Sequence, residues 1–341
     1  MSIRSSESTH SAAPALARNS CSALQRACRK AVLGRFSGLE AGRLVIRDGD
    51  GEWVLDGRGG DGTGRIDCPT ARVDVHAGAF WRMLATGGSV GAGEAYVAGL
   101  WDSPDLVAVI RLLAANRGLL DRMERGGARL YGWLLRGLHR LARNTVPGSR
   151  RNISAHYDLG NDFFEAWLDA RMQYSAALYL GPDDSLDRAQ QNKLARIANK
   201  LEIGPEDHLL EIGTGWGGLA IYMAGTTGCR VTTTTISAEQ YRYACKRVRE
   251  AGLADRIEVL MKDYRELEGT YDKVVSVEMI EAVGADFLET YLGVVRDRLS
   301  PDGLALIQAI TIEDYRYESA LKSVDFIKRY IFPGSFIPST S

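Results

Sequence analysis

The chain is organised around the stretch His208-Leu-Leu-Glu-Ile-Gly-Thr-Gly-Trp-Gly-Gly218. It begins with a short apolar run, which is typical of a buried strand. Four glycines within six positions follow, and the apolar residues 219–223 after them predict the start of a helix. Glycines between a strand and a helix let a nucleotide-like ligand lie against bare backbone at the helix N-terminus. The stretch therefore predicts a cofactor-binding loop, with an ordinary glycine turn as the alternative.

The pattern of this turn, Glu211-x-Gly213-x-Gly215, differs from the fingerprint of dinucleotide-binding proteins. The third glycine is out of register, and an acidic residue leads into the turn. An acid favours a positively charged sulfonium and disfavours a pyrophosphate. The turn therefore predicts S-adenosylmethionine as the cofactor.

The composition bounds the class of protein. The chain has 341 residues, 45% hydrophobic and 25% charged, which suits a globular protein with two domains. A net charge of −1 gives no overall attraction to nucleic acid, so we expect no nucleic-acid partner. The five cysteines are odd in number and lack C-x-x-C spacing, which argues against disulfides and a metal site and indicates a reducing cytoplasm. No apolar run approaches the ~18 residues of a membrane span.

The first third of the chain contains a predicted leader and a predicted domain. Residues 1–34 are rich in Ser, Ala and Arg and lack an apolar segment, so we expect a disordered leader. Residues 35–118 are expected to form a small α+β domain, with short strands at 44–46 and 52–55 and helical patterns from residue 79. A packed domain without chemistry of its own explains this part most simply.

Residues 119–152 form a basic linker. They carry eight arginines against Asp121 and Glu124, a local charge of +6. Leucines at helical spacing predict a basic amphipathic helix that binds an anionic membrane surface. A helix packed between two domains, with a solvated basic face, explains the same pattern.

Residues 153–341 alternate between the two kinds of secondary structure. Apolar and β-branched runs predict strands at 209–212, 231–236, 257–260, 273–278 and 304–312. Helical patterns lie before and between them, among them 186–201 and 287–299. This order predicts an α/β fold with a doubly wound, Rossmann-like parallel sheet. Ligands bind at the carboxyl ends of such strands, so we expect the site there.

Several motifs at those strand ends resemble one family, the cyclopropane-fatty-acyl-phospholipid synthases. The resemblance runs from about residue 36 to the end, and Gly88-Ser-Val-Gly-Ala-Gly-Glu-Ala-Tyr-Val-Ala-Gly-Leu-Trp101 looks like the family's N-terminal lipid-associated domain. The other motifs are His156-Tyr-Asp-Leu-Gly-Asn161, Met172-Gln-Tyr-Ser175, Glu211-Ile-Gly-Thr-Gly215, Thr235-Ile-Ser-Ala-Glu-Gln240, Asp263-Tyr-Arg265, Val275-Ser-Val-Glu-Met-Ile-Glu-Ala-Val-Gly284 and Tyr330-Ile-Phe-Pro-Gly334.

The resemblance implies an S-adenosylmethionine-dependent methyltransferase that acts on a cis double bond in an acyl chain of a phospholipid. Methylation of the alkene leaves a carbocation, and loss of a proton from the new methyl group closes a cyclopropane ring. Such a site excludes water and places aromatic faces or carboxylates near the cation. The lipid substrate implies a peripheral position at the inner membrane face. The available aromatic residues, any of which could instead be plain core, are Phe163, Phe164, Tyr174, Tyr264 and Tyr330.

The motif match also implies which residues contact the cofactor. They are Tyr174, Ser175, Gly213, Gly215, Thr235, Gln240, Asp263 and Tyr264. Ser237 and Gln240 also fit a helix capping box, so Gln240 could serve the backbone instead. Tyr264 is expected to stack near the adenine, and Asp263 to reach its exocyclic amine.

For catalysis the resemblance implies Glu281, Gln308 and Ile310. Many members of the family hold a bicarbonate ion as the base, with a cysteine, a glutamate, a histidine, a backbone isoleucine and a tyrosine. Here the glutamate matches Glu281 and the isoleucine matches Ile310, whereas Ala176 stands at the cysteine position and Gln308 at the histidine position. Backbone groups and the Gln308 amide are the remaining candidates to hold an anion.

This departure leaves other outcomes open. The same cation can lose a proton without closing the ring, which gives a methyl- or methylene-branched chain, so a changed base site could change the product. A lipid-binding protein without catalysis is the alternative from another class. The intact glycine turn argues against it.

The end of the sequence carries a further expectation. The chain stops at Ser341, soon after the Tyr330–Gly334 motif, where the resemblance predicts further strands and the tyrosine of the anion site. The methyltransferase domain is therefore expected to be C-terminally incomplete, with the strand at 304–312 as an apolar, aggregation-prone edge. A second chain, as in a homodimer, is one way to cover that edge.

Overall fold

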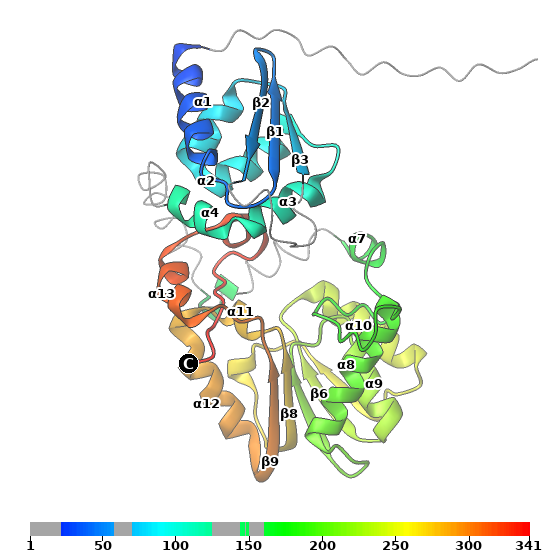
Figure 1. Cartoon of the computed structure of the whole chain (residues 1–341). Coiled ribbons are helices and arrows are strands. Elements are labelled where there is room, and N and C mark those ends of the chain that lie inside the picture. The colour runs from blue at the N-terminus through cyan, green and yellow to red at the C-terminus, as the bar shows by residue number, and fades with distance from the viewer. Residues whose placement is uncertain (1–21, 58–69, 125–143, 147, 150–159) are drawn as a thin grey trace, which may run out of the picture. The chain divides into compact units, whose positions relative to one another are not determined.

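A computed structural model describes residues 22–57, 70–124, 144–146, 148–149 and 160–341 of the chain (Figure 1). The chain divides into two compact units, Met1–Leu134 and Leu135–Ser341. Each unit has its own sheet and its own buried core.

Unit 1 is an α+β unit. Its sheet has the order β2-β1-β3-β4, in which β1 and β3 are parallel and the outer pairs are antiparallel. The predicted strands at 44–46 and 52–55 are confirmed as parts of β1 and β2. Strands β3 and β4 were not predicted. The elements are β1 (Arg43–Asp48), β2 (Gly51–Asp56), β3 (Thr70–Val75), β4 (Trp101–Asp102), α1 (Ala23–Phe36), α2 (Ala79–Val97), α3 (Leu106–Ala115) and α4 (Arg117–Glu124).

Helix α1 corrects the extent of the predicted leader. Ser22 caps the helix by accepting a hydrogen bond from the Gln25 backbone, and the Gln25 side chain returns one to Ser22. Val32 and Phe36 are buried in the core of unit 1. A disordered leader that reaches residue 34 is therefore wrong for residues 22–34, and residues 1–21 lie outside the described part.

The predicted basic linker, residues 119–152, falls largely outside the described residues. Helix α4 ends at Glu124, and the description resumes with residues 144–146 and 148–149. The proposed amphipathic helix thus stays a prediction.

Unit 2 contains a five-stranded parallel sheet of order β7-β6-β5-β8-β9, which confirms the predicted doubly wound, Rossmann-like α/β fold. The strands are β5 (His208–Ile212), β6 (Arg230–Thr234), β7 (Ile257–Leu260), β8 (Tyr271–Val277) and β9 (Leu299–Gln308). The helices are α7 (Asn161–Glu165), α8 (Leu186–Leu201), α9 (Gly218–Thr227), α10 (Ala238–Glu250), η1 (Tyr264–Glu266), α11 (Ile280–Val283), η2 (Ala285–Phe287), α12 (Leu288–Arg298), α13 (Asp314–Lys322) and η3 (Ile327–Ile331).

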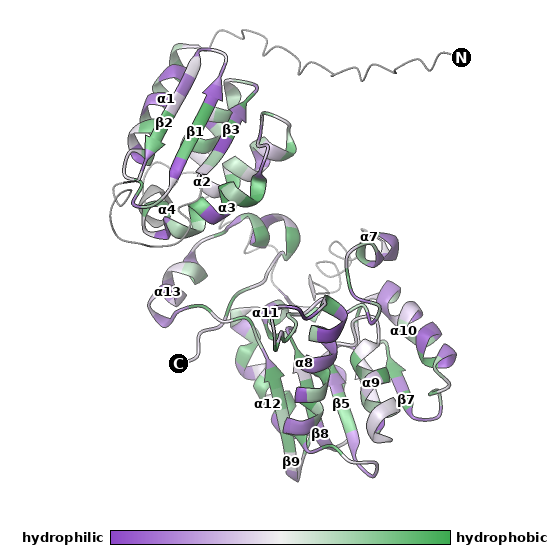
Figure 2. Ribbon diagram, turned by 45° about the vertical axis from the view of Figure 1, so that its right-hand side comes forward, coloured by the Kyte–Doolittle hydropathy of each residue, from purple (hydrophilic) through white to green (hydrophobic). Residues whose placement is uncertain are grey.

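Hydrophobic side chains cover both faces of this sheet. Leu209 of β5 packs with α8 and α9, whereas the next residue, Leu210, packs with Tyr291 of α12. Figure 1 shows α8 and α9 on one side of the strands and α12 on the other. Because both faces are covered, consecutive residues of the central strands are buried, such as Leu209 and Leu210 of β5 and Val274 and Val275 of β8, and Figure 2 shows β8 and β9 as largely hydrophobic.

Strand β9 differs from its prediction in both bounds. It begins at Leu299 rather than 304, because Leu299 already pairs with Tyr271 and the register shifts around the Pro301–Gly303 turn. It ends at Gln308 rather than 312, where pairing with Val277 ends. Among the described strands β9 lies at an edge, and Leu304 and Ile307 are 39% and 37% exposed. None of the described helices combines the length and hydropathy that a membrane span requires.

Candidate active site

The glycine turn between β5 and α9 has the geometry of a ligand-binding loop. The backbone N–H groups of Gly213 and Thr214 both donate to the Thr234 carbonyl, at 3.1 and 3.0 Å, which fixes the turn to the end of β6. Gly215 has φ 52°, a conformation that glycine adopts readily, and open space lies where a Cβ would stand. The turn thus leaves backbone uncovered where S-adenosylmethionine is predicted to bind.

Glu211, at the end of β5, does not play the electrostatic role expected of it. Its side chain is buried and accepts a 2.7 Å hydrogen bond from Thr233 Oγ1, which also contacts Thr214 Oγ1 at 2.7 Å. Burial raises the pKa of Glu211 to about 8, so the carboxyl is mostly protonated at neutral pH. Glu211 therefore supports the turn from beneath and offers little charge to a sulfonium.

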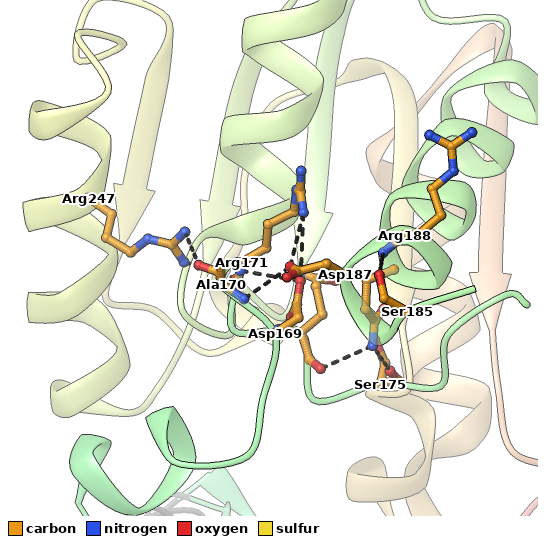
Figure 3. A network of polar contacts seen from close by, with 10 residues as sticks. Asp169, Ala170, Arg171, Ser175, Ser185, Asp187, Arg188 and Arg247 are labelled. Carbon is orange, nitrogen blue, oxygen red and sulfur yellow. Dashed lines mark hydrogen bonds and ion pairs between the residues drawn. The ribbon is translucent and has the colours of Figure 1, made fainter. Parts of the chain in front are cut away.

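A second segment, residues 169–176, lies against the glycine turn. A Cβ at Gly218 would stand 2.3 Å from the Arg171 carbonyl oxygen, so this approach requires glycine. The side chain of Asp169 has no exposed surface and accepts hydrogen bonds from the backbone of Gln173 and of Arg171. Asp169 and Arg171 are labelled in Figure 3. We call residues 169–176 the front loop.

Two helices hold the front loop in place. Arg247 of α10 donates to the carbonyl oxygens of Ala170 and Arg171 at 3.2 and 2.9 Å (Figure 3). From α8, Gln190 donates to the Ser175 carbonyl at 2.9 Å, and Lys193 Nζ lies 2.6 Å from Ser175 Oγ. The front loop is thereby anchored to both α8 and α10.

Lys193 is buried, with 4% of its surface exposed. Burial lowers its pKa to about 8, against the attraction of Glu278 and Asp169, which raises it. A buried lysine beside a predicted cofactor contact was not foreseen from the sequence, because a lysine on an amphipathic helix usually lies on the solvated face.

The front loop brings Tyr174 into an aromatic cluster. Its ring lies 5.6 Å from Phe164 of α7, 6.5 Å from Trp216 of the glycine turn and 6.3 Å from Phe332. Burial raises the pKa of Tyr174, so the phenol stays neutral. Of the other aromatic residues considered, Phe163 is 49% and Tyr330 47% exposed.

Thr235 and Gln240 contact each other beyond the end of β6. Thr235 Oγ1 lies 2.9 Å from Gln240 Oε1 and accepts a hydrogen bond from the Ser237 backbone. The Gln240 backbone donates to Ser237 Oγ at 3.3 Å, which caps α10 as the capping alternative predicts. The Gln240 amide nitrogen has no hydrogen-bond partner among the described residues and is free for a ligand.

Asp263 and Tyr264 follow β7. Asp263 is 1% exposed, and its carboxylate makes two 2.7 Å contacts with the Arg265 guanidinium. Arg265 also donates to the Asn144 carbonyl at 3.1 Å and to Ser149 Oγ at 3.3 Å. Most of Asp263's hydrogen-bonding capacity is therefore taken. No role was predicted for Arg265, although it belongs to the same motif as Asp263.

Tyr264 is nearly buried. Its ring lies 5.6 Å from Tyr291 and beneath the Arg265 guanidinium, and its buried hydroxyl has no partner within the described residues. Burial raises its pKa. The structure thus places Tyr264 against the core on one side and leaves one polar atom for a ligand to satisfy.

Glu281 and Ile310 meet as predicted. The Ile310 backbone N–H donates to Glu281 Oε1 at 2.5 Å, whereas Glu281 Oε2 is buried without a partner among the described atoms. Burial raises the pKa of Glu281, and the nearby Glu278 charge raises it further. The backbone donor expected to hold an anion therefore already binds a protein carboxylate.

Gln308 contacts Glu278, a residue of the Val275–Gly284 motif for which no role was predicted. Gln308 Nε2 and the Ala176 backbone N–H both donate to Glu278 Oε1 at 2.9 Å. Bicarbonate fits these residues poorly, because its expected donors serve Glu278 and Glu281, and two carboxylates repel a third anion. No step is therefore assigned to bicarbonate below.

Asn144 is another residue that sequence analysis missed. Its side-chain amide donates to the carbonyl oxygens of Ala282 and Gly334, both at 2.9 Å. It thus links the helix that carries Glu281 to the Tyr330–Gly334 motif. No residue type or spacing signalled this role, because the three partners are far apart in the sequence.

A parallel sheet with a glycine turn after β5 and a buried acid after β7 defines the class of S-adenosylmethionine-dependent methyltransferases. Comparison with known proteins narrows this class. Residues 146–341 match the mycolic acid cyclopropane synthetase family, and the chain belongs to that family.

Relatives and solved structures agree. The chain is 38% identical to tuberculostearic acid methyltransferase UfaA1 from Mycobacterium tuberculosis, over 82% of this chain and 67% of that protein. It is also 38% identical to the cyclopropane-fatty-acyl-phospholipid synthase of Escherichia coli, over 76% of this chain and 65% of that protein. The crystal structure of mycolic acid cyclopropane synthase CmaA1 with SAH and CTAB superposes with a TM-score of 0.51 at 28% identity, covering 56% of this chain and 70% of the other.

The family, the fold and S-adenosylmethionine as cofactor are thus confirmed predictions. The chain spans about two thirds of the length of these two relatives. The individual roles of the site residues, the substrate and the product stay proposals.

Proposed function

We propose that the protein transfers a methyl group from S-adenosylmethionine to a cis double bond in an unsaturated phospholipid acyl chain and that the product is a cyclopropane ring. The observation that supports this most strongly is the arrangement around the glycine turn. Aromatic Tyr174 stands on one side of it, and the carboxylates of Glu278 and Glu281 follow β8, the strand next to β5. Aromatic faces and carboxylates both favour a site for cations.

The chain's residues would hold the cofactor from three strands. Gly213 and Gly215 offer backbone, the free amide of Gln240 offers a donor, and the hydroxyl of Tyr264 lacks a partner among the described residues. When bound, S-adenosylmethionine supplies a methyl carbon that bonds to one alkene carbon as its bond to sulfur breaks, which leaves the other alkene carbon electron-deficient. The half-buried ring of Tyr174, which lies 6.5 Å from Trp216 of the glycine turn, would offer an aromatic face to such a cation.

The lipid substrate implies work at a membrane surface. With no membrane-spanning helix among those described, we propose a peripheral position at the inner face, aided by the basic residues 119–152. The relatives named for lipid substrates support this proposal.

A branched acyl chain is the second candidate product. It is supported by the departure at the base site, where Ala176 and Gln308 both bind Glu278, and by the similarity to a tuberculostearic acid methyltransferase. The same electron-deficient chain would then lose its proton without ring closure.

The test is incubation of the protein with vesicles of an unsaturated phospholipid and methyl-labelled S-adenosylmethionine. Mass spectrometry detects label in the acyl chain, and proton NMR distinguishes the shielded protons of a cyclopropane from those of a branched alkene. Vesicles of the saturated phospholipid serve as the control. Equal labelling of saturated chains, or cofactor binding with no lipid product from any unsaturated chain, would refute the proposed function.

A further inference from the structure

Glu278 has an unusual backbone conformation. It follows directly after β8 and has φ 49°, in the left-handed region that residues with a side chain seldom adopt. Its N–H donates to the Gln308 carbonyl at 2.8 Å, so the conformation is fixed by the neighbouring strand. Such a cost in backbone energy is typical of a functional site.

The conformation directs the carboxylate to the front loop. Glu278 Oε1 accepts from the Ala176 backbone and from the Gln308 amide, both at 2.9 Å. No described residue donates to the other oxygen, Oε2. One oxygen is thus held by two donors, and the other is available to a proton.

The position is also close to the cofactor turn. A Cβ on Gly213 would lie 3.4 Å from the side chain of Met279, the residue after Glu278. Ser175, a predicted cofactor contact, is adjacent in sequence to Ala176, whose backbone binds Glu278. Glu278 therefore borders the place where the methyl group is expected to be delivered.

The charged groups around Glu278 leave little room for a free anion. Lys193 faces it from α8, while Asp169 of the front loop and Glu281 of α11 add negative charge. The negative charges of Glu278 and Asp169 both raise the pKa of Lys193. A bicarbonate ion would have to displace Glu278 from its donors and then lie beside two carboxylates.

Glu281 is less suited to accept a proton from the substrate. Its Oε1 is occupied by the Ile310 N–H at 2.5 Å, and its Oε2 is fully covered by the surrounding protein. Glu281 is better placed to fix the backbone at Ile310, two residues after Gln308.

We propose that the Glu278 carboxylate accepts the proton released in the reaction, in place of a free bicarbonate ion. This inference rests on the proposed function. A C–H bond of the newly added methyl group breaks, and its electron pair forms the carbon–carbon bond that closes the ring. The proton passes to Glu278 Oε2, and the resulting carboxylic acid returns it to solvent. No oxidant or further reactant is needed.

The first experiment compares Glu278→Gln with the parent and with Glu239→Gln, which removes an exposed carboxylate of α10. Gln keeps an acceptor for Ala176 and Gln308 but is no base. We expect Glu278→Gln to lose product formation by about 100-fold or more, with unchanged SAH affinity by calorimetry, and Glu239→Gln to match the parent. Full activity of Glu278→Gln would overturn the inference.

The second experiment uses Glu278→Gly, which tolerates φ 49° and frees the donors of Ala176 and Gln308. Bicarbonate or formate added to this variant should restore product formation, whereas the parent should be equally active in carbonate-free buffer. A parent whose activity rises saturably with bicarbonate would contradict the proposed role.

A third measurement is independent of turnover. Line broadening of ¹³C-bicarbonate in NMR should reveal saturable binding to Glu278→Gly with SAH but none to the parent with SAH. Saturable binding to the parent would overturn the inference even if no lipid product forms. A failure of the proposed function can be distinguished from a failure of this inference. In the first case the protein would bind SAH but form no product from any unsaturated lipid.

Discussion

Arg265 should contribute strongly to the stability of unit 2, and Arg265→Met tests this. Its side chain is 15% exposed and makes a two-pronged ion pair with Asp263, which is 1% exposed. The substitution leaves a buried carboxylate without its cation. Breaking a buried pair from one side costs about 3–5 kcal/mol.

We expect the lower end of that range, because Arg265 is partly exposed. A loss of about 3 kcal/mol corresponds to about 6–12 °C in melting temperature for a unit of this size. Part of the loss comes from the hydrogen bonds of Arg265 to Asn144 and Ser149, which would no longer hold these two residues against η1.

Thermal and denaturant unfolding provide the assay. Arg242→Met is the matched control, because its pair with Glu239 is exposed and should contribute less than about 1 kcal/mol. Adding Asp263→Asn to Arg265→Met should recover part of the loss, since no buried charge is then unpaired. Equal melting temperatures for Arg265→Met and Arg242→Met would refute this account of the pair.

Further predictions concern the turn, the pH dependence, the site and the membrane. Gly215→Ala should weaken SAH binding about tenfold or more, whereas Gly252→Ala, at φ 69° with open space, should bind SAH as the parent does in calorimetry. Burial raises the pKa of Glu211 to about 8 in the folded state, so its stabilising contribution is complete below its unfolded pKa and is lost as pH rises towards about 8. In urea unfolding, the stability of Glu211→Gln should therefore decline less than that of the parent between about pH 5 and 8. Parallel curves of stability against pH would contradict this prediction. Glu281→Ala should lower product formation more than SAH affinity, because the Ile310 N–H loses its acceptor; unchanged turnover would exclude that role. Sedimentation with anionic liposomes should fall with rising salt, whereas salt-independent binding would favour the linker interpretation of residues 119–152.

Much of unit 2 could be predicted because local signals agreed with the fold. Helix α8 has its predicted bounds, since Ser185 caps its start and Gly204-Pro205 follows its end. The glycine turn could be predicted from the sequence because β5 is buried on both faces and four glycines follow it. By contrast, the end of β9 depends on pairing. Beyond Gln308 the apolar run continues, but the Ile310 N–H bonds to Glu281 rather than to a strand.

The backbone positions of the candidate site could be predicted from the sequence, whereas the burial and protonation of its charged side chains could not. Gly213, Gly215, Glu281 and Ile310 carry motif signals, and the structure brings the last two into contact. The sequence did not show that Glu211 is buried and mostly protonated or that Lys193 is buried. Burial depends on the packing of distant segments, which single-sequence patterns do not report.

The charges of this site favour a cation over an anion. Among the described residues, Arg171 pairs with Asp169 and Asp187, and Arg247 binds the carbonyl oxygens of Ala170 and Arg171, at the start of the front loop. At the other end of the loop, the Ala176 N–H binds the carboxylate of Glu278, which raises the pKa of Glu281 and opposes the lowering of the pKa of the buried Lys193 to about 8. An electron-deficient acyl chain reduces the repulsion among these carboxylates, whereas a bicarbonate ion increases it. Because Ala176 and Gln308 direct their donors to Glu278, the base and the group that stabilises the cation can be the same carboxylate. A site built in this way needs a bound anion only when Glu278 is removed.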